Sequence, residues 1–185
     1  QTMDYLTRQF NIDRRQAARV ERLAKSLLPQ VAPKPGVERD FAQQVLVAAA
    51  RLHELGLAIS HSGYHKHGAY VLENADMPGF SRREQMMLSF LVLNQRRKLR
   101  APEVSSYSFR ADWALVLVLR LAALFNRTRI DQRMPPIRLA PARKGWSIEL
   151  PASWLRKHPL VEEDLRAENE FLAAIGSGLL VKTRR

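Results

Sequence analysis

The chain has 185 residues, of which 46% are apolar, a composition typical of a folded protein with a buried core. It contains no cysteine, which excludes disulfide bonds and thiolate metal sites, and its longest apolar run, ALVLVL, is too short to cross a membrane. The formal net charge of +12 favours a polyanionic partner, such as a nucleic acid, another polymeric phosphate or an anionic membrane surface.

Helical periodicity dominates the first 130 residues. Apolar residues recur every three or four positions from 17 to 28, and Asp13 stands where a helix cap is expected, so we predict an amphipathic helix there. The proline-containing segment 31–36 ends it. Residues 38–55 then predict a long, mostly buried helix that ends near Gly56, because glycine is a common helix-stop residue.

Three further segments continue the helical pattern. Residues 63–74 predict a short helix. Ser81 and Glu84 form the spacing of a capping box, which predicts the start of the next helix. A basic loop is expected over 96–109, followed by another buried helix over 111–127. We therefore expect five or six helices around one core.

The pattern changes near residue 131. Alternating apolar residues at 137–140 and 146–150, on either side of a lysine-glycine turn, predict a small β-hairpin. A last helix is expected over 158–176. The sequence thus predicts a mainly α fold with a helical domain at 1–133 and a small α+β domain at 134–185.

The stretch LHELGLAISHSGYHKH, residues 52–67, holds four of the five histidines and the tandem pair His53-Glu54. With the order of the helices, this pair resembles the HD phosphohydrolase superfamily, an all-helical fold. The resemblance implies that a metal site would use positions occupied here by Gln16, His53, Glu54 and Ala123. Gln16 is a weak neutral ligand and Ala123 is none, so we expect a relic of this site, without catalytic residues or a bound metal.

A longer run, LHELGLAISHSGYHKHGAYVLENADMPGF, resembles the C-terminal region of exopolyphosphatases of the exopolyphosphatase/guanosine pentaphosphate phosphohydrolase family. LTRQFNIDRRQAARV before it and HPLVEEDLRAENEFL after it fit the same family, so the resemblance covers essentially the whole chain. It implies a bacterial hydrolase of two parts. An actin-like N-terminal half uses Mg²⁺ to remove terminal phosphate from inorganic polyphosphate, and a degenerate HD-like half precedes a small terminal domain.

This chain resembles the second part only. It lacks a strand followed by a glycine-rich phosphate loop, so we expect it to be inactive alone and to hold no cofactor of its own. The expected partners are polyphosphate, the protein's own actin-like domains and a second copy of the protein, but no membrane. Gln1 is not followed by a basic and then apolar leader, which with the absence of cysteine favours a cytoplasmic location.

The positive charge is concentrated in the middle of the chain. Residues 82–144 hold fourteen Lys and Arg against four Asp and Glu, which accounts for ten of the twelve net charges. Helical spacing places His61 and His65 on one face and turns His67 away, and imidazole becomes cationic near pH 6.5. The candidate polyphosphate-binding residues are His61, His65, Lys66, His67, Arg96, Arg97, Lys98, Arg100, Arg127 and Arg129.

Three alternatives remain open on the sequence alone. The chain could be an active metal-dependent HD phosphohydrolase in its own right. It could bind nucleic acid, although few aromatic residues lie among the basic runs, and single-stranded nucleic acid needs such stacking platforms. The basic residues could also form a solvated surface without a partner, because cations at helix C-termini are stabilising in themselves by roughly 0.3–1 kcal/mol.

Overall fold

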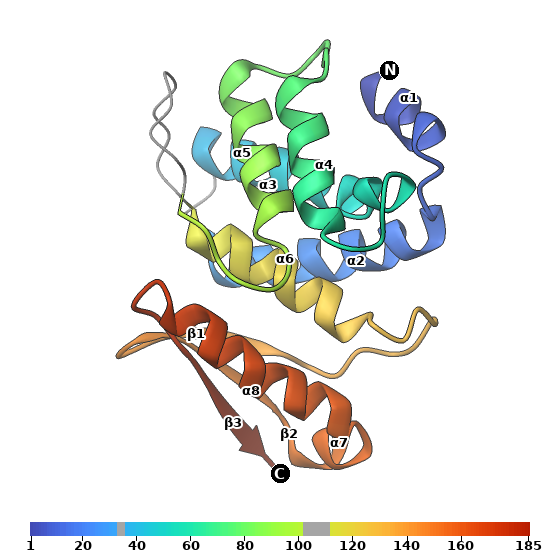
Figure 1. The fold of residues 1–185 in the computed structure, drawn as a ribbon. Helices are drawn as coiled ribbons and strands as arrows, with labels where there is room; N and C mark the ends of the chain where they lie inside the picture. The colour runs from blue at the N-terminus through green and yellow to red at the C-terminus, as the bar shows by residue number, and fades with distance from the viewer. Residues whose placement is uncertain (33–35, 102–111) are drawn as a thin grey trace.

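The structure, a computed structural model, describes residues 1–32, 36–101 and 112–185. In these residues six α-helices precede a small sheet, which confirms the predicted mainly α fold (Figure 1). The helices are α1 (Thr2–Gln9), α2 (Arg14–Leu27), α3 (Val37–Leu52), α4 (Tyr64–Asn74), α5 (Arg82–Leu93) and α6 (Trp113–Phe125). Two short 3₁₀ helices, η1 (Leu28–Gln30) and η2 (Leu55–Ala58), follow α2 and α3.

The C-terminal part is a three-stranded sheet with two helices. Its elements are β1 (Arg138–Ala142), β2 (Gly145–Pro151), α7 (Ala152–Lys157), α8 (Pro159–Ala173) and β3 (Leu179–Arg184). β1 and β2 form the predicted antiparallel hairpin, whereas β3 pairs in parallel with β2 and gives the order β1-β2-β3. The sequence did not predict β3, because its identity as a strand depends on pairing with a segment more than thirty residues earlier.

Local side-chain caps fix the starts of two predicted helices. Asp13 accepts a hydrogen bond from the backbone N–H of Gln16 at 3.0 Å and begins α2. Ser81 and Glu84 exchange both hydrogen bonds of a capping box, at 3.0 and 2.9 Å, and begin α5. Both helix starts are confirmed. The long helix expected to reach residue 55 instead ends at Leu52.

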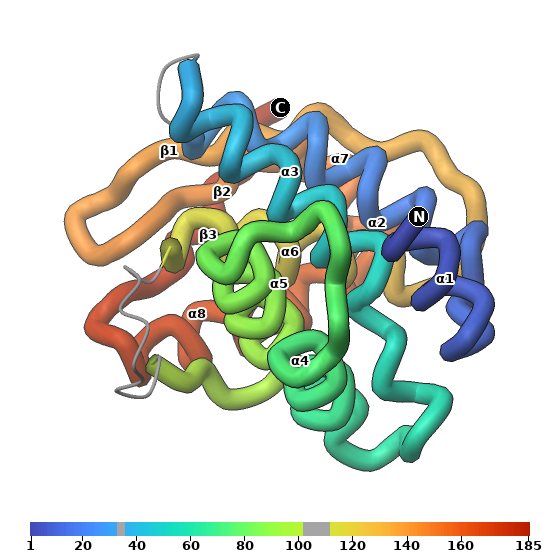
Figure 2. The backbone as a smooth tube through the Cα atoms, turned by 90° about the horizontal axis from the view of Figure 1, so that it is seen from above, coloured from blue at the N-terminus to red at the C-terminus, as the bar shows by residue number. Residues whose placement is uncertain are grey.

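Helix α6 is the centre of the fold. It is apolar on nearly all sides, and a helix of that kind must be buried. It lies between the other five N-terminal helices and the C-terminal part, and packs against α2, α3, α5 and α8 (Figure 1). Seen from above, α2 lies beside α3, and α4 lies beside α5 (Figure 2).

One continuous cluster of buried apolar side chains extends from the helices into the C-terminal part. It includes Leu117 of α6, Leu150 of β2 and Leu165 of α8. The domain boundary predicted near residue 133 therefore stays a prediction, since the core does not divide there. No helix in the described residues is both long and apolar enough to cross a membrane.

Candidate functional site

The four positions of the relic metal site come together in space. Gln16 of α2, His53 and Glu54 after α3, and Ala123 of α6 line one cleft of about 530 Å³, which we call the relic cleft. Its other lining residues are Tyr64, Gln95, Arg96, Arg97, Arg120, Leu124, Arg127, Arg129, Asp164, Ala167, Glu168 and Phe171. The four positions that the HD resemblance implies for a metal site therefore surround one cleft.

The polar side chains at the relic positions are engaged in other contacts. Gln16 donates from Nε2 to the carbonyl oxygen of Asn126 at 2.8 Å and accepts from Arg19 at 3.0 Å. His53 is buried, and its Nδ1 donates to the carbonyl oxygen of Ala50 at 2.6 Å. Burial lowers the pKa of His53, so this imidazole is neutral at pH 7. The described residues contain no group of three or more side chains arranged to hold a metal.

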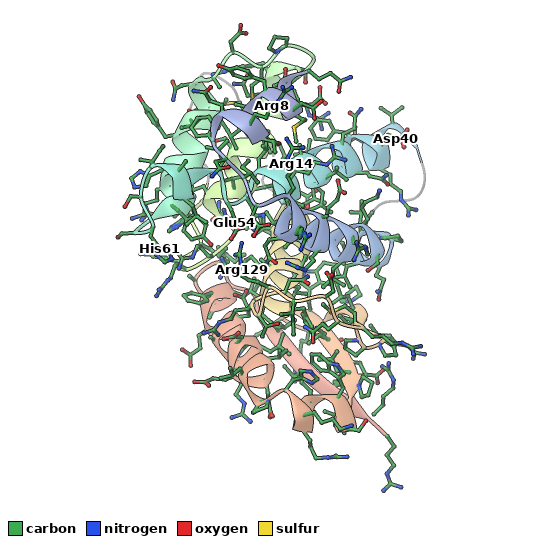
Figure 3. All side chains as sticks on the ribbon, turned by 90° about the vertical axis from the view of Figure 1, so that its right-hand side faces the viewer. Arg8, Arg14, Asp40, Glu54, His61 and Arg129 are labelled. Carbon is green, nitrogen blue, oxygen red and sulfur yellow. The ribbon has the colours of Figure 1, made fainter. Side chains whose placement is uncertain are left out.

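The cation beside Glu54 is a guanidinium. Arg129 donates from Nη1 and Nη2 to the two carboxylate oxygens of Glu54, at 2.7 and 3.0 Å, and from Nη2 to Asp13 at 2.9 Å (Figure 3). The hydrogen bonds to Glu54 raise the pKa of Arg129 above its ordinary value. Glu54 exposes only 9% of its surface, so Arg129 supplies the positive charge that a buried carboxylate needs.

Arg127 is also paired. It donates two hydrogen bonds to the carboxylate of Asp164 in α8, at 2.7 and 2.8 Å, and these bonds raise its pKa. The side chain of Arg127 is 63% exposed, and ion pairs as open as this contribute little to stability. The phosphate-binding roles predicted for Arg127 and Arg129 stay predictions, and each would require a phosphate to share or displace a carboxylate.

A second pocket, of about 520 Å³, lies beside the relic cleft. It is lined by His61, Ser62, Gly63, His65, Lys66, Arg96, Arg97, Lys98 and Arg100, and we call it the histidine pocket. Arg96 and Arg97 line both cavities, so the relic cleft and the histidine pocket form one continuous surface, which we call the basic track. Arg96 and Arg97, which follow α5, and Arg127 and Arg129, which follow α6, all line the relic cleft.

The cations of the histidine pocket differ from those of the relic cleft. In the described residues, none of Lys66, Arg96, Arg97, Lys98 and Arg100 forms an ion pair with a carboxylate. The guanidinium of Arg96 lies over the ring of Tyr64, 4.6 Å from its centroid. Five cations without carboxylate partners around one pocket form a surface suited to an anion.

The histidines are arranged differently from the helical spacing. α4 begins at Tyr64, so His61 precedes the helix, yet His61 and His65 both line the histidine pocket and His67 does not. Burial, with the neighbouring Arg96 and Lys66, lowers the pKa of His65 from 6.5 to about 4. The expectation that this imidazole gains charge near pH 6.5 is therefore wrong for His65 in the free protein, which is neutral at pH 7.

Buried Arg120 anchors the backbone of Asn94 and Arg97, just after α5. It lies on α6 and donates to the carbonyl oxygens of Asn94 and Arg97, at 2.8 and 3.0 Å, and by two bonds to Glu168 of α8, at 2.8 and 2.9 Å. Sequence reasoning missed this residue. The signal was available, because an arginine inside an otherwise apolar helix must find a partner for its charge.

Gly56 allows a close approach between η2 and α4. A Cβ atom at this position would overlap the carbonyl oxygen of Tyr64 and lie 2.8 Å from the backbone nitrogen of Gly68. Only glycine therefore allows η2 to lie directly against α4. This close approach places the start of α4, which forms one wall of the histidine pocket, beside Glu54 and the relic cleft.

Comparison with known proteins agrees with this geometry. Residues 1–169 match the family model described as Ppx/GppA phosphatase, domain III. Over 172 residues the chain is 36% identical to a guanosine-5'-triphosphate,3'-diphosphate pyrophosphatase of Pseudoalteromonas atlantica, which covers 91% of this chain and 34% of that protein. A protein of the same name from Pseudoalteromonas translucida is 30% identical over 182 residues, covering 97% of this chain and 37% of that protein.

The chain thus spans about a third of the length of these relatives. The match to the family model covers all six N-terminal helices, most of the C-terminal part and every lining residue of the two cavities except Phe171. The chain belongs to the Ppx/GppA phosphatase family and corresponds to its domain III.

Proposed function

We propose that this domain binds long inorganic polyphosphate along the basic track and guides the chain towards an active site outside these 185 residues. The observation that carries the proposal is the histidine pocket, where five lysine and arginine side chains have no carboxylate partner in the described residues. Unpaired cations that share one pocket repel each other, and a bound polyanion would relieve this repulsion.

The continuity of the basic track supports a chain-like ligand. Arg96 and Arg97 belong to both cavities, so a ligand that enters the histidine pocket can stay in contact with these two cations as it extends into the relic cleft, where the other arginines are paired with carboxylates. Each phosphate contact is weak in water, but the contacts add when the phosphates are covalently linked. Long chains should therefore bind much more tightly than single phosphates or short chains.

We further infer that the domain is not catalytic by itself. Hydrolysis of a phosphoanhydride needs an activated water and stabilisation of the developing charge, for which a bound metal ion is the usual source in HD-type sites. At the relic positions here, Gln16 and Ala123 are poor ligands, and both carboxylate oxygens of Glu54 accept hydrogen bonds from Arg129. Mg²⁺ and the catalytic residues would then belong to the rest of the protein.

A guanosine nucleotide with 5'-triphosphate and 3'-diphosphate groups is a second candidate ligand. The names of the two relatives point to it. The stacked pair of Arg96 and Tyr64, at the junction of the two cavities, offers a planar surface for a purine base. Five phosphates and one base would occupy the same basic track, so the two ligands should compete.

The proposal is tested by binding fluorescently labelled polyphosphate of about 100 units to the purified chain. The track variant changes Arg96, Arg97 and Lys98 to Ala. The control variant removes three exposed cations that line neither cavity and form no ion pair in the described residues, namely Arg156, Lys157 and Lys182. Both variants lose the same net charge, so they differ only in where that charge lies.

We expect the track variant to bind polyphosphate at least tenfold more weakly than the control variant. Equal losses in the two variants would show that polyphosphate binding follows net charge alone and would contradict the proposal. Competition at constant salt separates the remaining alternatives. Unlabelled polyphosphate should displace the probe at far lower phosphate concentration than duplex DNA, and displacement by the guanosine nucleotide at micromolar concentration would favour the second ligand.

A further inference from the structure

His65 holds a buried polar atom that the fold does not use. The residue exposes 6% of its surface, and its Nδ1 has no hydrogen-bond partner in the described residues. Leaving such a group unpaired costs on the order of 1–3 kcal/mol, and nearly all buried polar groups in native proteins are paired. The other buried histidine, His53, follows that rule by donating to the carbonyl oxygen of Ala50.

The surroundings of His65 all favour negative charge. It is the second residue of α4, a helix that begins after Gly63 in a left-handed conformation with φ of 65° and without a side-chain cap. The first turn of a helix leaves N–H groups without a partner in the helix, and its positive dipole end attracts anions. The charged side chains around the ring are the cations Lys66, Arg96, Arg97 and Arg100.

No carboxylate lines the histidine pocket in the described residues, so a metal ion would have no anionic ligand there. An oxyanion, by contrast, could accept from His65, from the start of α4 and from the arginines at the same time. A tetrahedral group has oxygens for donors that come from several directions, whereas a planar carboxylate accepts mainly within its own plane. These donors therefore suit a compact tetrahedral anion bound in the histidine pocket.

We propose that His65 and the first turn of α4 form a discrete site for a single phosphate group, which inorganic phosphate alone can occupy. The choice of phosphate among tetrahedral anions rests on the proposed function. His65 lines the pocket, but its Nδ1 has almost no accessible surface, so the ring must turn about χ2 for the Nδ1–H to reach a phosphate oxygen, and that hydrogen bond then satisfies the unpaired atom. The site would hold either the terminal phosphate of a chain or free orthophosphate, because both present the same group.

This site differs from the rest of the basic track in what it requires of the ligand. The arginines of the track recognise charge, and their affinity for the ligand rises with chain length. The His65 site recognises one phosphate, and additional phosphates do not raise its affinity. Its occupation by orthophosphate would compete with a chain end for the same position. Inorganic phosphate, the product of the reaction expected of the whole protein, would then inhibit binding of short chains more than binding of long ones.

The test is a titration of the 185-residue chain with inorganic phosphate, followed by the nitrogen resonances of the histidine rings and by calorimetry. Sodium chloride at matched ionic strength is the reference. We expect saturable 1:1 binding that shifts the Nδ1 resonance of His65. His65→Asn should weaken phosphate binding at least tenfold. The matched control is His67→Asn, two residues along the same helix and outside the pocket, and it should bind as the wild type does.

The outcomes separate this inference from the proposed function. If phosphate shifts His65 no more than chloride does, the single-phosphate site is wrong, whatever long polyphosphate does. If phosphate binds at His65 but long polyphosphate binds no better than orthophosphate, the proposed function is wrong and the site stands. Should His65→Asn not fold, the titration of the wild type still decides. The inference would also be overturned if longer chains shifted the His65 resonance at lower concentrations and chains blocked at both ends bound as well as unblocked chains.

A last set of titrations tests whether the site accepts only a terminal or free phosphate group. Tripolyphosphate and tripolyphosphate blocked at both ends are compared with orthophosphate at the His65 resonance. Shifts by orthophosphate and by unblocked tripolyphosphate, but not by the blocked form, support a site for a terminal or free phosphate. An equal shift by the blocked form shows that the site accepts internal phosphates, which contradicts a site for one terminal group.

Discussion

Arg129 donates two hydrogen bonds to the carboxylate of Glu54, although 75 residues separate them in the sequence. The resemblance to HD phosphohydrolases would place a metal ion beside this carboxylate, and the structure places a guanidinium there. The same guanidinium bonds to Asp13, the residue that caps α2. A single side chain thus connects the start of α2, the turn after α3 and the segment after α6. We infer that Arg129 provides here the positive charge that a bound metal ion would otherwise provide.

The pairing of Arg129 with Glu54 is expected to stabilise the fold. Arg129→Ala leaves a carboxylate that exposes only 9% of its surface without its counter-charge, and should lower the free energy of unfolding by about 1–3 kcal/mol. Glu54→Gln in the same background should recover part of that loss, because no buried charge then remains. Urea denaturation of the two single variants and the double variant gives the coupling directly. Strictly additive losses would show that the pair is only a surface contact.

The chain is expected to bind no divalent metal with a fixed stoichiometry. Gln16 and Ala123 cannot provide the ligands that an HD site needs, and Arg129 already neutralises Glu54. Elemental analysis after incubation with Mn²⁺ or Zn²⁺ and mild dialysis should find far less than one ion per chain. One tightly held ion per chain, lost on changing His53 to Ala, would show that the relic site still works.

The lowered pKa of His65 predicts a loss of stability in weak acid. The unfolded chain takes up a proton on this ring near pH 6.5, whereas the folded protein does so only near pH 4. Between these values the unfolded state binds more protons, so the free energy of unfolding must fall as the pH falls. The His65 contribution is full above pH 6.5 and decreases by about 3 kcal/mol by pH 4, at roughly 1.4 kcal/mol per pH unit.

Denaturation midpoints of the wild type and His65→Asn at pH 7, 6 and 5 measure this effect. His53 contributes in the same direction and is present in both proteins, so the difference between them isolates His65. The variant should lose clearly less stability than the wild type over this interval. Parallel pH profiles would mean that His65 is not buried as neutral imidazole in the folded protein.

Gly56→Ala is expected to disrupt the contact between η2 and α4. The added methyl group would overlap the backbone carbonyl of Tyr64, and no change of rotamer can relieve such a contact, so we expect a loss of at least about 3 kcal/mol. Gly79→Ala is the control, since Gly79 has φ of 90° but open space around it and should cost about 1–2 kcal/mol from backbone strain alone. Equal costs for the two variants would contradict the close approach at Gly56.

Features that depend on neighbouring residues could be predicted from the sequence. The capping box of Ser81 and Glu84 needs only a spacing of three, and the hairpin of β1 and β2 only a turn between alternating residues. Contacts between distant segments could not be predicted. Parallel strand β3 and the partners of Arg120 and Arg129 depend on how the helices pack, which no local pattern contains.

The same limit applied to the candidate site. Composition and spacing identified the basic clusters, and the structure places most of their members around two adjoining cavities. The sequence could not tell which cations are already paired. Arg127 and Arg129 have carboxylate partners 37 and 75 residues away in the sequence, whereas the cations around His65 have none in the described residues.

The central claim is that polyphosphate is held by the unpaired cations of the histidine pocket, and the slope of log Kd against log salt concentration tests it most directly. Every phosphate contact releases condensed counterions, so the slope counts contacts. The slope of the track variant should correspond to about three fewer phosphate contacts than the slope of the wild type. The control variant should keep the wild-type slope. Indistinguishable slopes for the wild type and the track variant would contradict the account.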